Sequence, residues 1–405
     1  MVMERLLKLM AEKNASDLFL APGSPIQLKI NGVTYPVNQQ RLDAGNVTAL
    51  VREIVDDSRW AVFEAERELN FGYAVQEVGS YRVNVFRQRG SAACVVRFIP
   101  NEIPTLADLH LPQVLGELIM EKRGLLLVVG ATGSGKSTSL AAMIDHRNGL
   151  RSGHILTLED PIEFSFRSRR SIISQREIGT DTASLEIALK NAMRQAPDCI
   201  LIGEIRDTST MSAALAYAQS GHLVLATLHA NNANHALNRI VSFYTPENRR
   251  VLLSDLSATL RAVVSQRLIR SADGGRLPAV EVMLNTRHIA ELIENGQLTE
   301  VKDAMEQSLA AGSCTFDHAL AQLVRERRIA REDALANADS PTNLLWMLEN
   351  ESAHTAQPAQ APASAPPDRA DVVPAAIASA ALGMPSKNDD GKAGSPSFSE
   401  FLLNI

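Results

Sequence analysis

The chain reads Gly130-Ala-Thr-Gly-Ser-Gly-Lys-Ser137 directly after an apolar run at 125–129. The octet has the spacing Gly-x-x-x-x-Gly-Lys-Ser of a Walker A loop. Its glycines let the backbone curl so that successive amides point at phosphate groups. A helix expected after the loop adds the positive end of its dipole. A strand before the loop and a helix after it are the context that this motif requires, so the octet predicts a nucleotide-binding α/β core rather than a glycine-rich turn.

Each polar residue of the loop has an expected role in holding ATP. Lys136 is expected to contact the β- and γ-phosphates, and the Ser137 hydroxyl to bind Mg²⁺. The predicted cofactors are therefore ATP and Mg²⁺. The predicted nucleotide-binding residues are Gly130, Ala131, Thr132, Gly133, Ser134, Gly135, Lys136, Ser137 and Thr138.

A second apolar run, at 199–202, ends in Gly203-Glu204. A carboxylate at the end of an apolar strand is the geometry of a Walker B motif. We therefore expect Glu204 to help Ser137 organise the metal ion. The alternative is a buried structural carboxylate, which the glycine before it and Arg206-Asp207 after it disfavour.

An acidic loop lies between the two motifs and reads Thr157-Leu-Glu-Asp-Pro-Ile-Glu163. Its three carboxylates within five residues repel one another unless a cation or ordered water lies between them. Because phosphoryl transfer depends on positioning and charge stabilisation, one of them is expected to polarise the attacking water. A solvated acidic loop is the usual alternative.

Two histidines, His222 and His229, bracket the apolar run at 223–228. A single histidine in such a place is more often structural than catalytic. A pair at a P-loop core is suited to sensing the γ-phosphate, because neutral imidazole relays hydrogen bonds near pH 7. The residues alone leave these two roles evenly balanced.

The chain of 405 residues is expected to be α/β with two folded domains. Residues 1–100 predict a helix ending near Asn14 and a small antiparallel α+β domain. Pro100 and Pro104 bound a linker at 101–108. Residues 109–350 alternate apolar strands with helical patterns, which is typical of a parallel α/β core, and become mostly helical after Gly274-Gly275. The strands expected are 18–20, 26–30, 81–86 and 93–99 in the first domain, and 125–129, 155–158, 199–202 and 223–227 in the second.

Residues 351–405 are rich in alanine, proline and serine and are predicted to be disordered, because they bury too little apolar surface to offset the entropy of ordering. The apolar tip at 398–405 is either an ordinary chain end or a short docking helix for a partner.

Composition narrows the class of protein. The net charge of −6 and only 4% aromatic residues disfavour a nucleic-acid-binding surface. Three cysteines without a Cys-x-x-Cys pair fit a reducing cytoplasm. No apolar stretch reaches the length of about 20 residues that crosses a bilayer. We therefore expect a cytoplasmic protein, or one peripheral to a membrane, with no transmembrane segment and no nucleic-acid partner.

The motifs together carry a specific resemblance. The segment Met193-Arg-x-x-Pro-Asp-x-Ile-Leu-Ile-Gly-Glu-Ile-Arg-Asp207 resembles the signature of the secretion ATPases of type II secretion and type IV pili. The segment at 157–163 looks like the Asp box of that GspE-type superfamily, and 221–229 like its His box. The resemblance covers about residues 1–350. It implies a hexameric ring ATPase with a PAS-like N-terminal domain and a RecA-like C-terminal domain.

Within this superfamily the chain is similar to the PilT/PilU family of type IV pilus retraction ATPases, which serve twitching motility. It lacks the cysteine quartet of the assembly and secretion ATPases. Gln219 stands where PilT-like proteins usually have Glu, and residues 288–293 replace the Ala-Ile-Arg-Asn-Leu-Ile motif needed for retraction. The segment at 226–234 is most like PilU, the accessory paralogue. These departures leave the nucleotide site intact, but they argue against retraction by this chain on its own.

The resemblance also assigns roles to single residues. It implies that Glu204 is the Walker B carboxylate and Glu163 the catalytic glutamate, with Glu159 as the next candidate. His229 and His222 fall in the His box. Arg82 and Arg97 match arginines of the N-terminal domain that reach the phosphates, where a permanently charged guanidinium stabilises the developing charge. Without the resemblance, both arginines would read as exposed strand residues.

The function expected is that of an ATP-hydrolysing motor subunit that powers or assists pilus retraction. Implied partners are further copies of the chain in a hexamer, a paralogous retraction ATPase and the inner-membrane platform protein at the pilus base. One rival is an ATP-binding scaffold subunit that works through a partner motor, and another is a pilus-assembly or secretion ATPase. The missing cysteine quartet disfavours the second rival.

Overall fold

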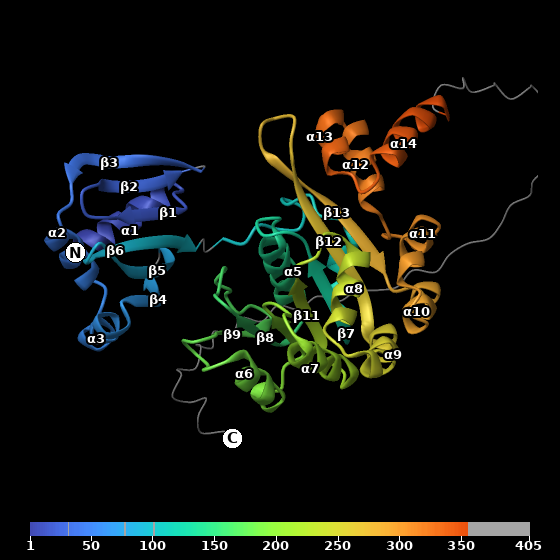
Figure 1. The fold of residues 1–405 in the computed structure, drawn as a ribbon, viewed down its shortest axis with the longest axis horizontal. Helices are drawn as coiled ribbons and strands as arrows, with labels where there is room; N and C mark the ends of the chain where they lie inside the picture. Colours follow the sequence, from blue (N-terminus) through green and yellow to red (C-terminus); the bar gives the residue numbers. More distant parts are fainter. Residues whose placement is uncertain (31, 77, 100–101, 355–405) are drawn as a thin grey trace, which may run out of the picture. The chain divides into compact units, whose positions relative to one another are not determined.

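The computed structural model describes residues 1–30, 32–76, 78–99 and 102–354, with side chains up to residue 350. Two β-sheets with separate cores organise this part of the chain (Figure 1). No helix in the described ranges is long and apolar enough to span a bilayer. The predicted tail beyond residue 354, including its apolar tip, lies outside the described residues.

The first sheet has six antiparallel strands in the order β3-β2-β1-β6-β5-β4. Its strands alternate buried and outward-facing residues, as in β5, because one face packs on helices α1 and α2. The expected antiparallel α+β character is thus observed. The elements are α1 (Val2–Glu12), β1 (Asp17–Leu20), β2 (Pro25–Ile30), β3 (Val33–Arg41), α2 (Ala44–Arg52), α3 (Asp57–Glu66), β4 (Glu68–Val75), β5 (Gly79–Gln88) and β6 (Ser91–Ile99).

The second sheet has seven strands in the order β13-β12-β7-β11-β10-β8-β9. All neighbouring strands are parallel except the β12–β13 hairpin, which is antiparallel. The strands are β7 (Gly124–Val129), β8 (Gly153–Glu159), β9 (Ser171–Glu177), β10 (Cys199–Ile202), β11 (Leu223–Leu228), β12 (Leu260–Arg270) and β13 (Arg276–Leu284).

Helices cover both faces of the second sheet, which explains the almost uninterrupted apolar runs in its central strands. In β7, Leu125, Leu127 and Val129 pack with helices α6 to α10, whereas Leu126 and Val128 pack with α4 and α5 on the other face. These helices are α4 (Val114–Leu118), α5 (Lys136–Leu150), α6 (Leu185–Ala192), α7 (Thr208–Gln219), α8 (Ala233–Ser242), α9 (Arg249–Thr259) and α10 (Arg287–Glu294).

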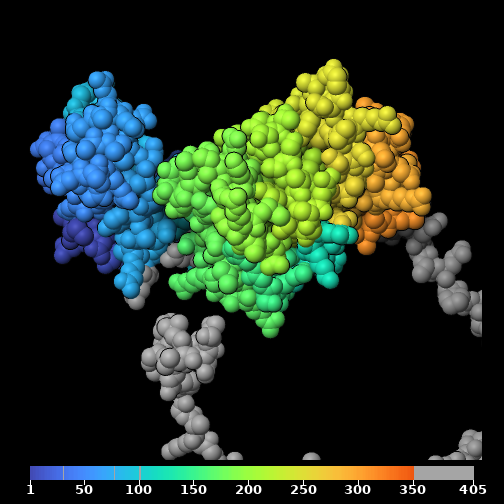
Figure 2. Space-filling model, turned by 90° about the horizontal axis from the view of Figure 1, so that it is seen from below, coloured from blue at the N-terminus to red at the C-terminus, as the bar shows by residue number. Residues whose placement is uncertain are grey.

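Helices α12, α13 and α14 pack around Phe316 and Leu344 on the part of the β12–β13 hairpin that carries Ile269 and Ala279. In Figure 2 the orange surface of this region continues the yellow surface formed by residues around 250–290. The remaining helices are α11 (Val301–Glu306), α12 (Phe316–Arg325), α13 (Arg331–Asn337) and α14 (Pro341–His354), with single 3-10 turns at Met193–Gln195, Pro246–Asn248 and Leu298–Glu300.

The structure corrects some of the expected elements. Residues 276–284 are strand β13 rather than the start of a helical region, because Gly274 makes the turn of a hairpin. Helix α14 continues to His354, past the boundary at 350. Strands β3, β4, β9 and β12 were not expected from the sequence. Residues 102–108 form no helix or strand, which is compatible with a linker, while the division into domains at 1–100, 101–108 and 109–350 stays a prediction.

Candidate nucleotide site

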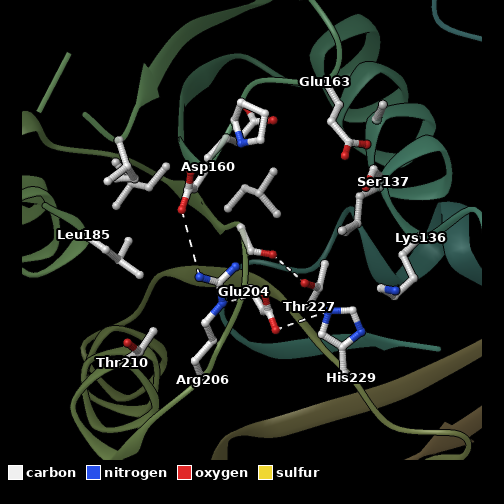
Figure 3. A pocket seen from close by; sticks show the side chains of 18 of the residues that line it. Lys136, Ser137, Asp160, Glu163, Leu185, Glu204, Arg206, Thr210, Thr227 and His229 are labelled. Atoms are coloured by element: carbon white, nitrogen blue, oxygen red, sulfur yellow. Dashed lines mark hydrogen bonds and ion pairs between the residues drawn. The ribbon is translucent and has the colours of Figure 1, made fainter. Parts of the chain in front are cut away.

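The Walker A octet lies where the motif predicts, between β7 and α5 (Figure 3). Gly135 has φ +89°, a left-handed conformation that favours glycine, and a Cβ there would lie 2.7 Å from Gln266 Nε2. Gly130 also admits no side chain, because a Cβ would lie 2.5 Å from Ser134 Oγ. Both glycines of the motif are therefore required by the packing of the loop.

Lys136 begins helix α5 and folds back over the loop. Its Nζ donates to the carbonyl oxygens of Gly130 and Ala131, each at 2.9 Å. Burial lowers the pKa of the Lys136 ammonium below its usual value, and the nearby carboxylates of Glu204 and Glu163 act in the opposite direction. The cation is thus held inside the loop and faces two acidic side chains, which is the placement expected for a phosphate-binding lysine.

The other predicted side chains gather at the carboxyl edge of the same sheet. β8, β10 and β11 run parallel to β7, so the residues that follow them emerge beside the loop. Glu163 comes from the loop after β8, Glu204 from the end of β10 and His229 from the end of β11. All three line one pocket of about 820 Å³, which is also lined by Lys136 and Ser137.

Glu204 is the centre of a small ionic network. One carboxylate oxygen lies 3.3 Å from His229 Nε2, and the other accepts from Arg206 Nε at 2.7 Å. Arg206 in turn lies 4.0 Å from Asp160, as the dashed lines in Figure 3 show. Thr227 on β11 donates to the carbonyl of Gly203 and so ties the strand end that carries Glu204 to its neighbour.

Glu159 and Glu163 occupy different surroundings. Glu159 is partly buried and accepts hydrogen bonds from Thr157 Oγ1 at 2.6 Å and Gln175 Nε2 at 3.3 Å. Its burial raises the pKa of the carboxyl group. Glu163 is exposed, and in Figure 3 it points into the same part of the pocket as Ser137. Glu159 is thus engaged with its own loop, whereas the Glu163 carboxylate faces the pocket.

Three of the predicted catalytic residues lie elsewhere. His222 stands at the amino end of β11, opposite to His229, and its Nδ1 contacts the Tyr217 carbonyl and Ser220 Oγ. Arg82 and Arg97 are directly opposite each other on strands β5 and β6 of the first sheet. None of these three residues lines the pocket. The catalytic roles of these three residues stay predictions.

Sequence reasoning gave no role to Arg206 or Thr227. Arg206 lies two residues after the Walker B carboxylate, and that spacing was the one available signal for their ion pair. Thr227 is the last residue but one of a wholly buried strand and carries no signal of its own.

The residues present suit a magnesium ion. Mg²⁺ prefers hard oxygen ligands and keeps several waters. Ser137 offers a hydroxyl, and Glu204 a carboxylate that is only 22% exposed, in the pocket that holds Lys136. The donor set therefore fits Mg²⁺ bound together with phosphate oxygens rather than an all-protein cage.

Comparison with known proteins agrees with this geometry. Residues 2–314 match the model of the family described as type II/IV secretion system protein. The chain is 46% identical to the type IV pilus ATPase PilU of Pseudomonas aeruginosa, over 86% of this chain and 92% of PilU. It is 39% identical to the type IV pilus retraction ATPase PilT of the same organism, over 84% of this chain and 98% of PilT.

Among solved structures, the pilus retraction motor PilT with bound ADP superposes with a TM-score of 0.80 at 37% identity, covering 85% of this chain and 99% of PilT. The family model spans most of the chain, and the relatives match along nearly their whole length. On this evidence, the chain belongs to the type II/IV secretion system protein family.

Proposed function

We propose that this chain is an ATP-hydrolysing subunit of a hexameric motor that powers or assists the retraction of type IV pili. One observation carries the proposal: Lys136, Glu204, Glu163 and His229 converge in one pocket behind a complete Walker A loop. The relatives named PilU and PilT, aligned over most of their length, support the place of this activity in twitching motility.

Each residue then has a part in the reaction. The loop amides and Lys136 hold the β- and γ-phosphates, and Glu163 orients the attacking water and accepts its proton. Ser137 and Glu204 hold Mg²⁺, which supplies charge neutralisation when bound. His229 senses the γ-phosphate through its contact with Glu204.

The test is ATP turnover by the purified full chain. We expect Glu204→Gln to lower kcat by about 100-fold or more, because the metal loses its carboxylate partner, while ADP affinity stays close to that of wild type. Lys136→Ala is expected to weaken the binding of both ATP and ADP. Equal phosphate release by wild type and Glu204→Gln would overturn the enzymatic proposal.

The assisting role has a specific observation in its favour. In helix α10, which carries the segment at 288–293, the three apolar residues Ile289, Leu292 and Ile293 are buried and match the retraction motif given above. The exposed positions His288 and Glu291 differ from it. We infer that the helix keeps its packing but presents another surface to the pilus machinery, which favours work alongside a paralogous retraction ATPase.

Partner dependence can be tested in cells. The chain should act in the cytoplasm at the inner-membrane pilus base, with the platform protein as a further partner. We expect full twitching only when the paralogue is also present. Complementation with Glu204→Gln separates the alternatives, because this variant is expected to keep nucleotide binding. Restored twitching favours the scaffold role, and lost twitching favours a motor that must hydrolyse its own ATP.

A further inference from the structure

Strand β12 passes next to the Walker A loop. Ser265 on β12 pairs with Val129, the last residue of β7, so the next residue, Gln266, lies level with the start of the loop. The backbone oxygen of Gln266 is 2.6 Å from the position that a Cβ on Gly130 would take. The loop therefore begins in direct contact with the Gln266 backbone.

The Gln266 side chain reaches the other end of the loop. The residue is only 3% exposed, and its Oε1 accepts a hydrogen bond from Ser139 Oγ at 2.7 Å. Its Nε2 lies 2.7 Å from where a Cβ on Gly135 would be. One buried glutamine thus touches the first glycine of the loop, the last glycine, and the first turn of the helix that follows.

These contacts matter because of what the loop has to do. A loop that binds phosphate through its amides must hold them in one arrangement, and glycines give the backbone freedom to adopt many. Fixing such a loop before the ligand arrives reduces the entropy lost on binding. Gln266 supplies a rigid support from a strand that belongs to no nucleotide-binding motif.

We propose that Gln266 is a positioning residue that sets the conformation of the Walker A loop for nucleotide binding. It acts through Gly130, Gly135 and Ser139 and is not itself part of the pocket lining, which takes Leu268 from this strand. The inference rests on the proposed function, since it assumes that this loop binds ATP and ADP.

The first variant is Gln266→Met, which removes the hydrogen bond at similar volume. The loop holds the phosphates in the ground state and the transition state alike. We therefore expect KM for ATP and Kd for ADP to rise by about tenfold each, which is the effect of losing one buried hydrogen bond. kcat should stay within about twofold of wild type. The control is Gln322→Met on helix α12, where the exposed amide donates to Glu326, and it should change neither constant.

The second variant is Ser139→Ala, which removes the same hydrogen bond without altering β12. It should weaken ADP binding in the same direction, and the double variant should be no weaker than the stronger single one. If Gln266→Met folds and binds ADP as tightly as wild type, the proposal is overturned. If Gln266→Met does not fold, an unaltered ADP affinity in Ser139→Ala overturns it instead. Wild type that binds neither ATP nor ADP would instead overturn the proposed function.

Discussion

Glu159 and Glu163 are four residues apart, yet only one of them is free to act on a water molecule. Burial raises the pKa of the Glu159 carboxyl group, but the hydrogen bonds that it accepts from Thr157 and Gln175 act in the opposite direction and weaken it as a base. The exposed Glu163 faces the pocket. A carboxylate already committed to two donors inside its own loop is a poor proton acceptor for the attacking water.

We therefore expect Glu163→Gln to lower kcat by about 100-fold or more, with ATP affinity within about threefold of wild type. Glu159→Gln keeps an oxygen that accepts from Thr157, so it should lower kcat less than tenfold. The measurement is steady-state phosphate release together with equilibrium nucleotide binding. The opposite ranking of the two variants would transfer the catalytic role to Glu159.

At the residue scale, the sequence predicted some residues of this site and not others. Lys136 and Glu204 follow from motif spacing because each motif combines a strand end with a required residue type. Glu159 and Glu163 cannot be separated in that way, because their hydrogen-bond partners lie elsewhere in the fold. Gln266 gives no signal at all, since its place beside the loop follows from the pairing of β12 with β7.

At the scale of elements, the strands predicted in the second sheet are those covered on both faces. β7 and β11 are buried along their whole length and read as apolar runs. The strands that were missed are mixed in character. β3 is almost wholly exposed, and β12 carries Arg261 and Arg267 among its apolar residues. Packing on neighbouring elements decides the structure of such segments, so composition alone does not reveal them.

Strand β13 carries a buried carboxylate with a consequence for stability. Glu281 is 3% exposed, lies opposite Ser265 on β12, and accepts from Ser265 Oγ at 2.9 Å and the Ala233 amide at 2.7 Å. Burial raises the pKa of Glu281 to about 7, although these two hydrogen bonds favour the charged form. The carboxyl group thus binds a proton more readily in the folded chain than in the unfolded chain.

This difference predicts the sign of a pH effect. Between the unfolded pKa near 4.5 and the folded pKa near 7, the folded state binds more protons, so the Glu281 contribution to stability decreases as pH rises. Glu281→Gln keeps the accepting oxygen but cannot ionise. We expect the variant to gain up to about 3 kcal/mol relative to wild type between pH 4.5 and pH 8.

The measurement is denaturant unfolding of both proteins at several pH values, compared as a difference so that other titrating groups cancel. Glu294→Gln, on exposed helix surface, is a matched control and should give a flat difference. A flat difference for Glu281→Gln as well would show that the carboxyl group titrates alike in the folded and unfolded chains.

At the scale of the whole molecule, the antiparallel first sheet and the parallel second sheet were both predicted from the sequence, because turn signals and apolar runs distinguish them. The order of their strands was not, since it depends on pairings between distant segments. The first sheet also brings two arginines together. Arg82 and Arg97 are paired across β5 and β6, and such like charges repel. Asp17 on β1 accepts from Arg97 Nε at 3.0 Å and compensates one of them.

The side chain of Arg82 makes no hydrogen bond or ion pair within the part of the chain that the structure describes, so its guanidinium is available for an anion. If it reaches a γ-phosphate in the assembled ring, Arg82→Ala should lower kcat by about 10³-fold, the usual contribution of such an arginine. ADP binding to the Walker A loop should change little, because the charge that Arg82 stabilises develops during transfer. Arg41→Ala, an exposed arginine of β3 in the same sheet, is the control. Turnover of the purified full chain decides the matter. A fall shared by Arg41→Ala would indicate a general charge effect, and wild-type turnover in Arg82→Ala would leave the chemistry to the second sheet alone.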